Sequence, residues 1–384
     1  MYEREVRGAL LEILRASLNE AADFTLALEK IKPNILPSVF LLAKRQDLAH
    51  IVAAFVLDNG IEVEDSFKEQ LRKERFASIY RCEQMRHALA EISATLEAEG
   101  VDYIPLKGAV LRSYYPYESM RTSCDIDVLI RKSDLKRAVN ALKVRGYTQT
   151  GSFFHDVWLY SPGRVHLELH FSICEKMEKL DAVLNNAWQY ASHTEKRRYE
   201  FSKEFFVYYT YAHMSYHFLG GGCGMRSLAD IWIMEHKMGA HYSEARGLLE
   251  KAGIYKFASE MSALANKCFG DGDHELLSDP LFDFIASGGT YGSVESNMAV
   301  QKTRSKSPFV YLIRRLFLPY PDMCIAHPIL KKLPFLLPFF WLVRWFKALF
   351  FGNKKRFVKE LSAANNTSEK SIEAANALRS RLEI

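Results

Sequence analysis

The sequence predicts an α+β protein, in which a small mixed β-sheet is flanked along the chain by two helical regions. Apolar residues recur at helical spacing from the start to about Gly100, strand-like alternation follows, and helical spacing returns beyond about Leu180. Strands interleaved with helices over so short a central span indicate a compact sheet covered by helices. We therefore expect three units, a helical N-terminal domain over residues 1–95, an α/β core over 96–200 and a helical C-terminal domain over 201–384.

The N-terminal region has the apolar spacing of packed helices. Leu11, Leu14 and Leu18 recur every three or four residues, so they lie on one face of a helix. A long charged stretch follows, and its spacing predicts one helix over Ser66–Glu99. Gly100 marks the end of that helix, because glycine adopts the left-handed conformation that terminates helices.

The central region alternates short apolar runs with helical segments. A Ser-Pro-Gly turn at 161–163 separates two alternating runs, which is the pattern of a β-hairpin. Ser133 is a residue type that caps helices, and Gly146 is a type that ends them. The expected elements are a strand over Val101–Leu106, a helix over Gly108–Tyr115, a buried strand over Asp125–Ile130, a helix from Ser133 to Gly146, and hairpin strands over Phe153–Tyr160 and Arg164–Phe171.

The C-terminal region is expected to be helical, with no further pair of strands. Gly220–Gly222 is interpreted as a hinge between helices and not as a phosphate loop, because it does not connect a strand to a helix. The polar tail over Ser362–Ile384 is expected to fray or to form one exposed helix. The apolar spacing predicts helices over Lys203–Leu219, Met225–Met238 and Tyr242–Ala252.

Composition excludes several classes of protein. With 384 residues, of which 48% are hydrophobic and 25% charged, the chain is typical of a globular protein and not of a disordered or collagen-like one. A net charge of +5 permits an anionic ligand but does not indicate a nucleic-acid track. The six cysteines form no C-x-x-C pair, and the charged N-terminus lacks the apolar run of a secretory signal. We therefore expect a cytoplasmic protein with reduced thiols.

The sharpest local motif is the pair Asp125 and Asp127 on an expected strand. Successive side chains of a strand point to opposite faces, so the two carboxylates share a face while Ile126 and Val128 pack in the core. Adjacent carboxylates repel each other, and a divalent cation between them offsets the repulsion; hard oxygen ligands suit Mg²⁺ or Mn²⁺. For an isolated pair of this kind, a strand end that reaches solvent is the simpler interpretation.

A third carboxylate strengthens the metal interpretation. From Val165 to His170 apolar and polar residues alternate, so His166, Glu168 and His170 share the polar face of a strand in the same sheet. If Glu168 converges with the two aspartates, the three carboxylates make a site for two metal ions. A zinc site made of His166, Glu168 and His170 alone is less favoured, because residues at i, i+2 and i+4 spread too far along a strand.

Two cations lie upstream of the aspartates. Lys107 and Gly108 stand at the expected turn from strand to helix, where backbone N–H groups and the helix dipole attract phosphate. Arg121, in the loop before the aspartates, adds a second cation. The Lys-Gly pair gains its meaning from this position, one short helix before the acidic strand.

Taken together, these motifs resemble those of the uncharacterised nucleotidyltransferase family of the polymerase-beta-like superfamily. The resemblance spans about residues 80–345, and the combination is far more specific than any single motif. The matching motifs are Leu106-Lys107-Gly108, Tyr115-Pro116, Arg121, Asp125-Ile126-Asp127, His166-Leu167-Glu168-Leu169-His170, His213-Met214-Ser215-Tyr216-His217 and Arg226-Ser227-Leu228-Ala229-Asp230.

The resemblance implies a nucleotidyltransferase fold, in which two aspartates and a third acidic residue bind two divalent ions and an NTP such as ATP. By position, these are Asp125, Asp127 and Glu168. The superfamily's usual Gly-Ser, which holds the triphosphate, is replaced here by Gly108-Ala109, in keeping with this family's own Leu-Lys-Gly pattern. The resemblance does not identify the acceptor substrate.

A second polar group is expected on the C-terminal helices. His213 and His217 are four residues apart on one helix face, and no glutamate of a zinc-protease motif lies between them, so a structural role is favoured over metal binding. Arg226 and Asp230 are also four apart. We expect these four side chains to form a polar network beside the nucleotide cleft or at a domain interface.

The most apolar segment of the chain is 333–352. Pro334, Pro338, Arg344 and Lys347 interrupt it, so it does not have the pattern of a membrane span. The sequence favours a helix packed on the C-terminal domain. The alternative is a helix that lies in a membrane interface or on a partner, because aromatic residues and flanking lysines suit both.

The resulting functional hypothesis is transfer of a nucleoside monophosphate from an NTP to an acceptor hydroxyl, with release of pyrophosphate. The acceptor is left open among a small molecule, a protein side chain and an RNA end, and so is the oligomeric state. Two alternatives use the same fold: a module that binds a nucleotide without catalysis, and a membrane-peripheral protein that acts on a surface-bound substrate. The first predicts nucleotide binding without pyrophosphate release.

Overall fold

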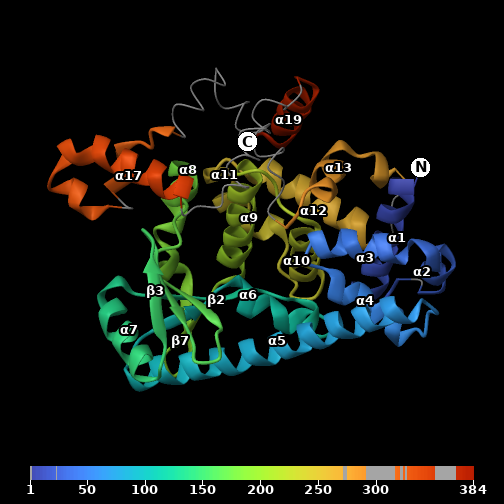
Figure 1. Ribbon diagram of the computed structural model, residues 1–384, viewed down its shortest axis with the longest axis horizontal. Coiled ribbons are helices and arrows are strands. Elements are labelled where there is room, and N and C mark those ends of the chain that lie inside the picture. The colour runs from blue at the N-terminus through green and yellow to red at the C-terminus, as the bar shows by residue number, and fades with distance from the viewer. Residues whose placement is uncertain are drawn as a thin grey trace.

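The structure, a computed structural model, describes residues 2–22, 24–270, 275–290, 316–320, 323–324, 327–350 and 369–384. Its fold is α+β, as predicted: a seven-stranded mixed sheet is combined with helices that precede and follow it in the chain. Figure 1 shows the sheet toward one end of the molecule and the N-terminal helices at the other.

The N-terminal helices pack through the apolar faces that their spacing predicts. Leu14 and Leu18 are fully buried, in a core that also contains Phe218 and Phe257 from the C-terminal helices. The N-terminal and C-terminal helices therefore share one hydrophobic core. The N-terminal helices are α1 (Tyr2–Leu18), α2 (Phe24–Lys30), α3 (Leu36–Arg45) and α4 (Ala49–Asp58).

The expected long charged helix is confirmed as α5 (Asp65–Ala98), which has 34 residues. Near its start Leu71 packs in the core of the helical regions, whereas Met85 and Ile92 pack in the core of the sheet. Gly100 follows with a φ of +64°, the left-handed conformation expected at a helix end. Figure 1 shows α5 running beneath both the N-terminal helices and the sheet, so it continues through the expected boundary at residue 95.

The sheet has the strand order β3-β4-β5-β2-β1-β7-β6. The predicted hairpin is confirmed, because β4 pairs antiparallel with β5. The strand β2 pairs parallel with β5 on one side and antiparallel with β1 on the other. The strands are β1 (Tyr103–Pro105), β2 (Asp125–Ile130), β3 (Thr148–Ser152), β4 (Asp156–Tyr160), β5 (His166–His170), β6 (Ala191–Glu195) and β7 (Arg198–Phe201).

Three of these strands were not predicted. The expectation of no strand pair beyond Leu180 is wrong, since β6 and β7 form an antiparallel hairpin and β7 pairs parallel with β1. The strands β3 and β6 form the two edges of the sheet, and most of their side chains are polar and exposed. A polar edge strand has no apolar alternation, so hydrophobic periodicity does not detect it.

Two helices accompany the central strands. The first, α6 (Lys107–Leu111), continues into a 3₁₀ turn over Arg112–Tyr114, close to the predicted helix. The second is α7 (Leu135–Val144). Ser133 does not cap α7 as expected; it lies in a 3₁₀ turn, and Asp134 occupies the capping position without a side-chain hydrogen bond.

The C-terminal helices surround α9, the most deeply buried helix of the region. Tyr208, Tyr211 and Phe218 of α9 are fully buried, and its first turn is capped by the Ser202 hydroxyl, which accepts from the Phe205 N–H. The predicted helices are confirmed, the third beginning with a 3₁₀ turn at Tyr242. The helices are α8 (Glu178–Leu184), α9 (Lys203–Leu219), α10 (Met225–His236), α11 (Arg246–Lys251), α12 (Tyr255–Phe269) and α13 (Pro280–Ser287).

Two further helices lie in the C-terminal tail. The helix α19 (Glu369–Leu382) is not the exposed helix expected, because Leu378 and Leu382 are buried and Arg381 pairs with Asp279 and Glu260. The other helix, α17 (Leu337–Phe350), contains most of the apolar segment. Among the residues that the structure describes, no helix is both long enough and apolar enough to cross a membrane.

Candidate active site

The three predicted carboxylates converge because their two strands are parallel neighbours in a fixed register. Asp127 on β2 lies opposite Glu168 on β5, and Asp125 lies opposite His166. The alternating residues Ile126 and Val128 are buried in the core of the sheet, so the carboxylates occupy its other face. The convergence expected from period-two alternation is therefore present.

The carboxylates and histidines form two overlapping groups of donor atoms. In one, Asp125, His166 and Glu168 bring donor atoms within 4.8 Å of one another, and in the other Asp127, Glu168 and His170 do the same. Glu168 belongs to both groups, so one residue borders two adjacent positions suited to a cation.

A third group, which sequence reasoning missed, lies next to these. His155, Asp156 and His170 also have donor atoms within 4.8 Å of one another, and the His155 and His170 rings stack with centroids 5.4 Å apart. The sequence contained a sign of this group, because the antiparallel pairing that extends from the predicted hairpin turn places Asp156 opposite His170. The buried Nδ1 atoms of His155 and His170 have no hydrogen-bond partner among the described residues.

The electrostatics of the group favour added positive charge. Burial, reinforced by the Asp127 charge, raises the pKa of Glu168 to about 7. Burial and Asp127 also raise the pKa of Asp125. Burial acts in the same direction on Asp127, but the hydrogen bond and charge of His170, 3.1 Å away, outweigh it and lower the pKa of Asp127. Three carboxylates this close repel one another, and cations would relieve that repulsion.

The turn from β1 into α6 places one lysine near these carboxylates. Lys107 begins α6, and burial lowers its pKa to about 8 despite the opposing charge of Asp127. Its Nζ lies 5.9 Å from the centre of the Tyr209 ring. The neighbouring Gly108 has a steric reason to be glycine, because a Cβ there would lie 3.1 Å from Nη1 of Arg121. The loop and the start of α6 thus pack closely.

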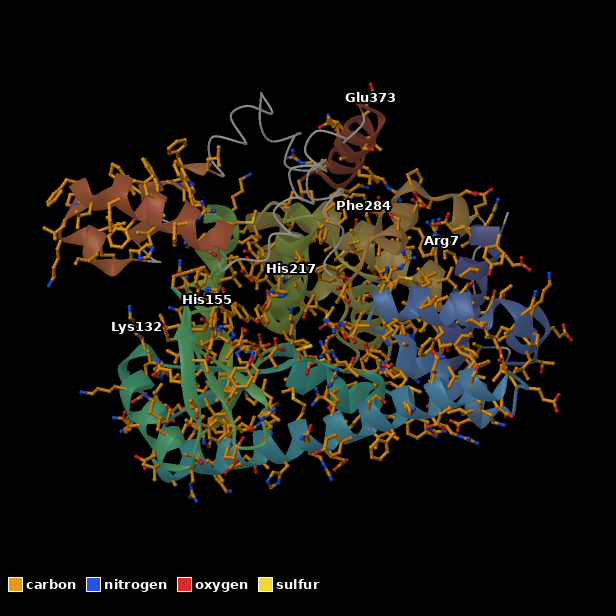
Figure 2. All side chains as sticks on the ribbon, viewed as in Figure 1. Arg7, Lys132, His155, His217, Phe284 and Glu373 are labelled. Atoms are coloured by element: carbon orange, nitrogen blue, oxygen red, sulfur yellow. The ribbon has the colours of Figure 1, made fainter. Side chains whose placement is uncertain are left out.

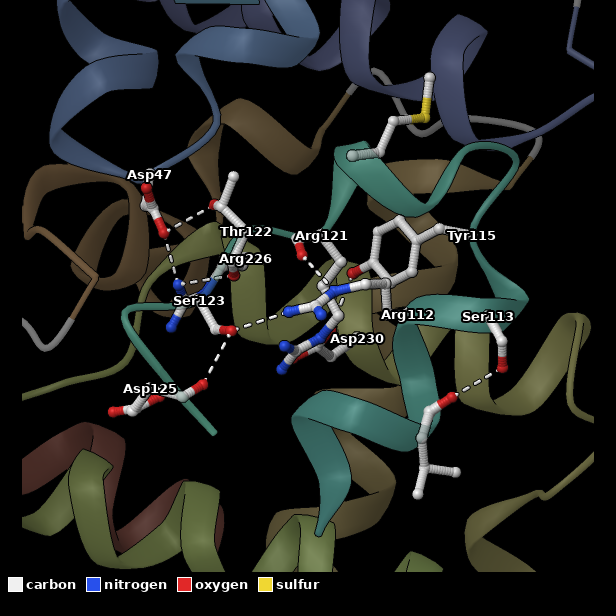
Figure 3. A network of polar contacts seen from close by, with 12 residues as sticks. Asp47, Arg112, Ser113, Tyr115, Arg121, Thr122, Ser123, Asp125, Arg226 and Asp230 are labelled. Carbon is white, nitrogen blue, oxygen red and sulfur yellow. Dashed lines mark hydrogen bonds and ion pairs between the residues drawn. The ribbon is translucent and has the colours of Figure 1, made fainter. Parts of the chain in front are cut away.

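Arg121 is tied to a carboxylate of the C-terminal helices. Its Nε donates to Oδ1 of Asp230 at 2.8 Å and its Nη2 donates to Oδ2 at 2.9 Å, with Arg121 only 5% exposed. The Tyr115 hydroxyl donates to the same Asp230 at 2.8 Å. One edge of the guanidinium is therefore committed to Asp230, and the bridge holds the loop before β2 against α10 (Figure 3).

Arg226 connects the same loop to the N-terminal helices. Its guanidinium donates to the Asp47 carboxylate, which also accepts from the Thr122 hydroxyl at 3.0 Å (Figure 3). Asp47 adopts a φ of +56°, and it follows α3 in the chain. Arg226 and Asp230 thus both take part in polar contacts: Asp230 pairs with Arg121 of the loop, and Arg226 pairs with Asp47 beside the N-terminal helices.

The histidines instead form a chain with a glutamate that the sequence analysis did not select. Oε1 of Glu175 lies 2.9 Å from Nδ1 of His213, and Nε2 of His213 lies 2.8 Å from Nε2 of His217. Burial lowers the pKa of His213 well below its usual value, and burial and His213 lower the pKa of His217 to about 2. Both rings are therefore neutral at physiological pH.

The three carboxylates, Lys107, the histidine chain and the Arg121–Asp230 bridge border one cavity of about 340 Å³ between the sheet, α6, α9 and α10. Figure 2 labels His155, beside the sheet, and His217, on α9, which belong to different walls of it. Every predicted site residue except His166 lines this cavity. The predicted residues that line it are Lys107, Gly108, Arg121, Asp125, Asp127, Glu168, His170, His213, His217, Arg226 and Asp230.

A small mixed sheet that presents three carboxylates beside a lysine-bearing turn is the arrangement expected of a nucleotidyltransferase. The sequence model of the uncharacterised nucleotidyltransferase family matches residues 37–270, and the chain belongs to this family. The match starts and ends earlier than the expected 80–345, so it includes helices of the N-terminal domain and excludes the apolar segment. Comparison with the curated proteins and with the solved structures gave no match.

Proposed function

We propose that the protein is a metal-dependent nucleotidyltransferase that moves an NMP from an NTP to an acceptor hydroxyl and releases pyrophosphate. The observation that carries the proposal is the position of Glu168, shared by two donor groups that also contain Asp125 and Asp127. Two cations that share a carboxylate can stabilise both the attacking and the leaving oxygen of an in-line displacement at phosphorus. Membership of the family supports nucleotidyl transfer in general.

The residues present fit a pair of hard divalent ions. Asp125, Asp127 and Glu168 supply oxygen donors on one sheet face, and the raised pKa of Glu168 supports the addition of positive charge there. These three would hold Mg²⁺ or Mn²⁺, with His166 and His170 as neighbours. Bound there, the ions would neutralise phosphate charge and polarise the reacting phosphorus centre.

Other residues of the cavity act on the substrates directly. The Lys107 ammonium, buried beside Asp127, supplies a fixed positive charge for the phosphate chain. The acceptor oxygen forms a bond to the α-phosphorus, the bond to the bridging oxygen breaks, and pyrophosphate leaves. The hydroxyl proton passes to the Glu168 carboxylate, which lies beside the cation position on the acceptor side.

The histidine chain forms the opposite wall and orients the acceptor. If the Glu175 carboxylate accepts from Nδ1–H of His213, then Nε2 of His213 accepts from Nε2–H of His217. In this order of protons, Nδ1 of His217 is the unprotonated nitrogen at the end of the chain. We assign Glu175, His213 and His217 a positioning role, because they act through one another and not on the phosphorus.

Two features bear on the acceptor substrate and on the cellular location of the protein. A cavity of about 340 Å³ admits a nucleotide and a small part of an acceptor, which fits a small molecule, a protein side chain or an RNA end better than a long duplex. The six cysteines all lie in the described residues, and none is in a disulfide. With an NTP as substrate, this supports a place in the cytoplasm.

The deciding experiment is calorimetric titration of ATP, GTP, CTP and UTP, each with Mg²⁺ or Mn²⁺, into the wild type and into Asp125→Asn/Asp127→Asn. We expect metal-dependent binding of at least one NTP, lost in this variant and retained in Asp58→Asn/Asp65→Asn, which changes two exposed carboxylates. Binding of no nucleotide would overturn the proposal. Binding without pyrophosphate release in the presence of a broad acceptor mixture would favour the non-catalytic module.

A further inference from the structure

The helix α17 presents a continuous apolar stripe to solvent. Phe335, just before the helix, and Phe339, Leu342 and Phe346 within it are 73%, 57%, 58% and 56% exposed. They are separated by four, three and four residues, so they lie on one face. Single exposed apolar residues are ordinary on protein surfaces, whereas a stripe of three phenylalanines and a leucine marks a contact surface.

The opposite face of α17 is packed, which fixes the orientation of the stripe. Trp341 donates from Nε1 to the Leu318 carbonyl at 3.0 Å, and Trp345 donates to the Leu316 carbonyl at 2.8 Å. The ring of Phe317 packs edge-on against both tryptophans, with centroids 5.1 Å away. Both tryptophans are half-buried through these contacts, and the exposed stripe lies on another face of the helix. Figure 1 shows α17 at an outer edge of the molecule.

The surrounding sequence has one sign of charge. Between Asp322 and Glu360 there is no other acidic residue. Lys331 and Lys332, directly before the stripe, are exposed. The basic residues of this stretch are Lys331, Lys332, Arg344, Lys347, Lys354, Lys355, Arg356 and Lys359.

We propose that α17 docks on an anionic lipid bilayer, with the stripe of Phe335, Phe339, Leu342 and Phe346 inserted at the level of the headgroups. An apolar face bordered by lysines and arginines is the pattern of a helix that lies in a membrane interface, and the cations match anionic headgroups. A second copy of this chain fits less well, because it would bring a segment of the same positive charge to the contact. The inference is independent of the proposed nucleotidyl transfer.

The test is sedimentation of the full chain with vesicles of equimolar phosphatidylcholine and phosphatidylserine, compared with vesicles of phosphatidylcholine alone. We expect binding to the mixed vesicles that weakens as salt rises. Phe339→Ser/Leu342→Ser/Phe346→Ser should lower the partition coefficient by about tenfold or more. Lys331→Gln/Lys332→Gln should lower it by roughly tenfold and reduce the salt dependence.

A matched control is available on α5. Phe76, Ile79 and Tyr80 are also exposed, but acidic and basic residues are mixed around them. Phe76→Ser/Ile79→Ser/Tyr80→Ser should leave vesicle binding unchanged, and circular dichroism shows whether each variant is folded. Three results would each overturn the inference: no binding of the wild type to mixed vesicles, equal binding by the α17 variant, or a dimer in solution that depends on the stripe while vesicles are not bound.

Discussion

Asp127 of β2 and Glu168 of β5 are direct neighbours across a pair of parallel strands, and they differ in the direction of their pKa shifts. Burial and Asp127 raise the pKa of Glu168, whereas His170 holds the pKa of Asp127 down in spite of burial. At neutral pH Glu168 is therefore about half protonated, whereas Asp127 is ionised. The pair stores an unfavourable interaction that bound cations would remove.

Glu168→Gln should stabilise the metal-free protein and prevent its stabilisation by Mn²⁺. The pKa of Glu168 is about 7 in the folded protein, against an ordinary value of 4.5, so ionised Glu168 destabilises the folded state. This destabilisation is complete above about pH 7 and vanishes below about pH 4.5. In EDTA at pH 8 the gain should be about 1–3 kcal/mol. Thermal melts with and without Mn²⁺ and NTP measure both effects.

The same variant should lose nucleotidyl transfer by about 100-fold or more. Glu195→Gln, which changes an exposed glutamate of β6, is the control and should alter neither property. A Glu168→Gln protein that Mn²⁺ still stabilises as much as the wild type would contradict the shared position of this carboxylate.

Lys107→Met should raise stability and weaken NTP binding. Burial lowers the pKa of Lys107 from 10.5 to about 8. The charge on Lys107 therefore destabilises the folded state, fully below about pH 8 and progressively less as the pH rises toward 10.5. At pH 7 the gain should reach at most about 3 kcal/mol. Denaturant unfolding at several pH values measures the gain, and calorimetry measures the loss of NTP affinity.

The matched control for this lysine is Lys136→Met, at an exposed position on α7. It should leave both stability and NTP affinity unchanged. A stability gain for Lys107→Met that persists unchanged at pH 10 and above would show that its origin is apolar packing and not the buried charge.

Breaking the bridge between Arg121 and Asp230 should destabilise the protein strongly. Both partners are buried and joined by two hydrogen bonds, so Arg121→Met leaves the buried Asp230 carboxylate without its guanidinium partner, at a cost of about 3–5 kcal/mol. Arg121→Met/Asp230→Leu removes both charges and should recover most of the loss. Denaturant unfolding of the two single variants and the double variant completes the cycle.

The double variant also separates the two roles considered for Arg121. If the guanidinium serves only to hold the loop before β2 against α10, NTP affinity should return together with stability. Recovered stability without recovered NTP affinity would instead show that Arg121 contributes charge to the phosphates, as the sequence analysis expected.

Glu175→Gln should slow transfer while leaving NTP affinity unchanged. The amide can donate to Nδ1 of His213, which reverses the order of protons along the chain to His217. We expect a loss in transfer rate of about 10- to 100-fold, by analogy with other residues that orient a histidine. Rate measurements at saturating NTP, beside calorimetry, check it, and Glu178→Gln at an exposed position is the control.

The carboxylate site could be predicted from the sequence because period-two alternation assigns each residue of a strand to a face. Once Asp125 and Asp127 share a face and Glu168 lies on the polar face of a second strand, only the pairing of the strands is undetermined. The parallel register of β2 with β5 supplies it. The resemblance of the motifs to a known family then predicted a nucleotide substrate, which the alternation of residues alone does not indicate.

The partners of the site residues could not be predicted, because they come from distant loops. Asp47 contacts Arg226, and Glu175 contacts His213. Both acidic residues lie outside helices and strands, where the spacing of residues in the sequence does not predict which side chains meet. The edge strands β3 and β6 escaped detection for a related reason: their residues are polar and exposed, and the neighbouring strand that orders them is remote in sequence. Tertiary contact, and not local pattern, determines these features.

The length of α5 has a mechanical consequence. At about 1.5 Å per residue, its 34 residues form a helix about 50 Å long, and its two ends pack in different hydrophobic cores. A sharp bend in α5 would break hydrogen bonds along its axis, so the helix resists a change in the angle between the sheet and the N-terminal helices. A cut within α5 would therefore interrupt the helix that connects Asp47, the residue that anchors Arg226, to the strands that carry Asp125, Asp127 and Glu168.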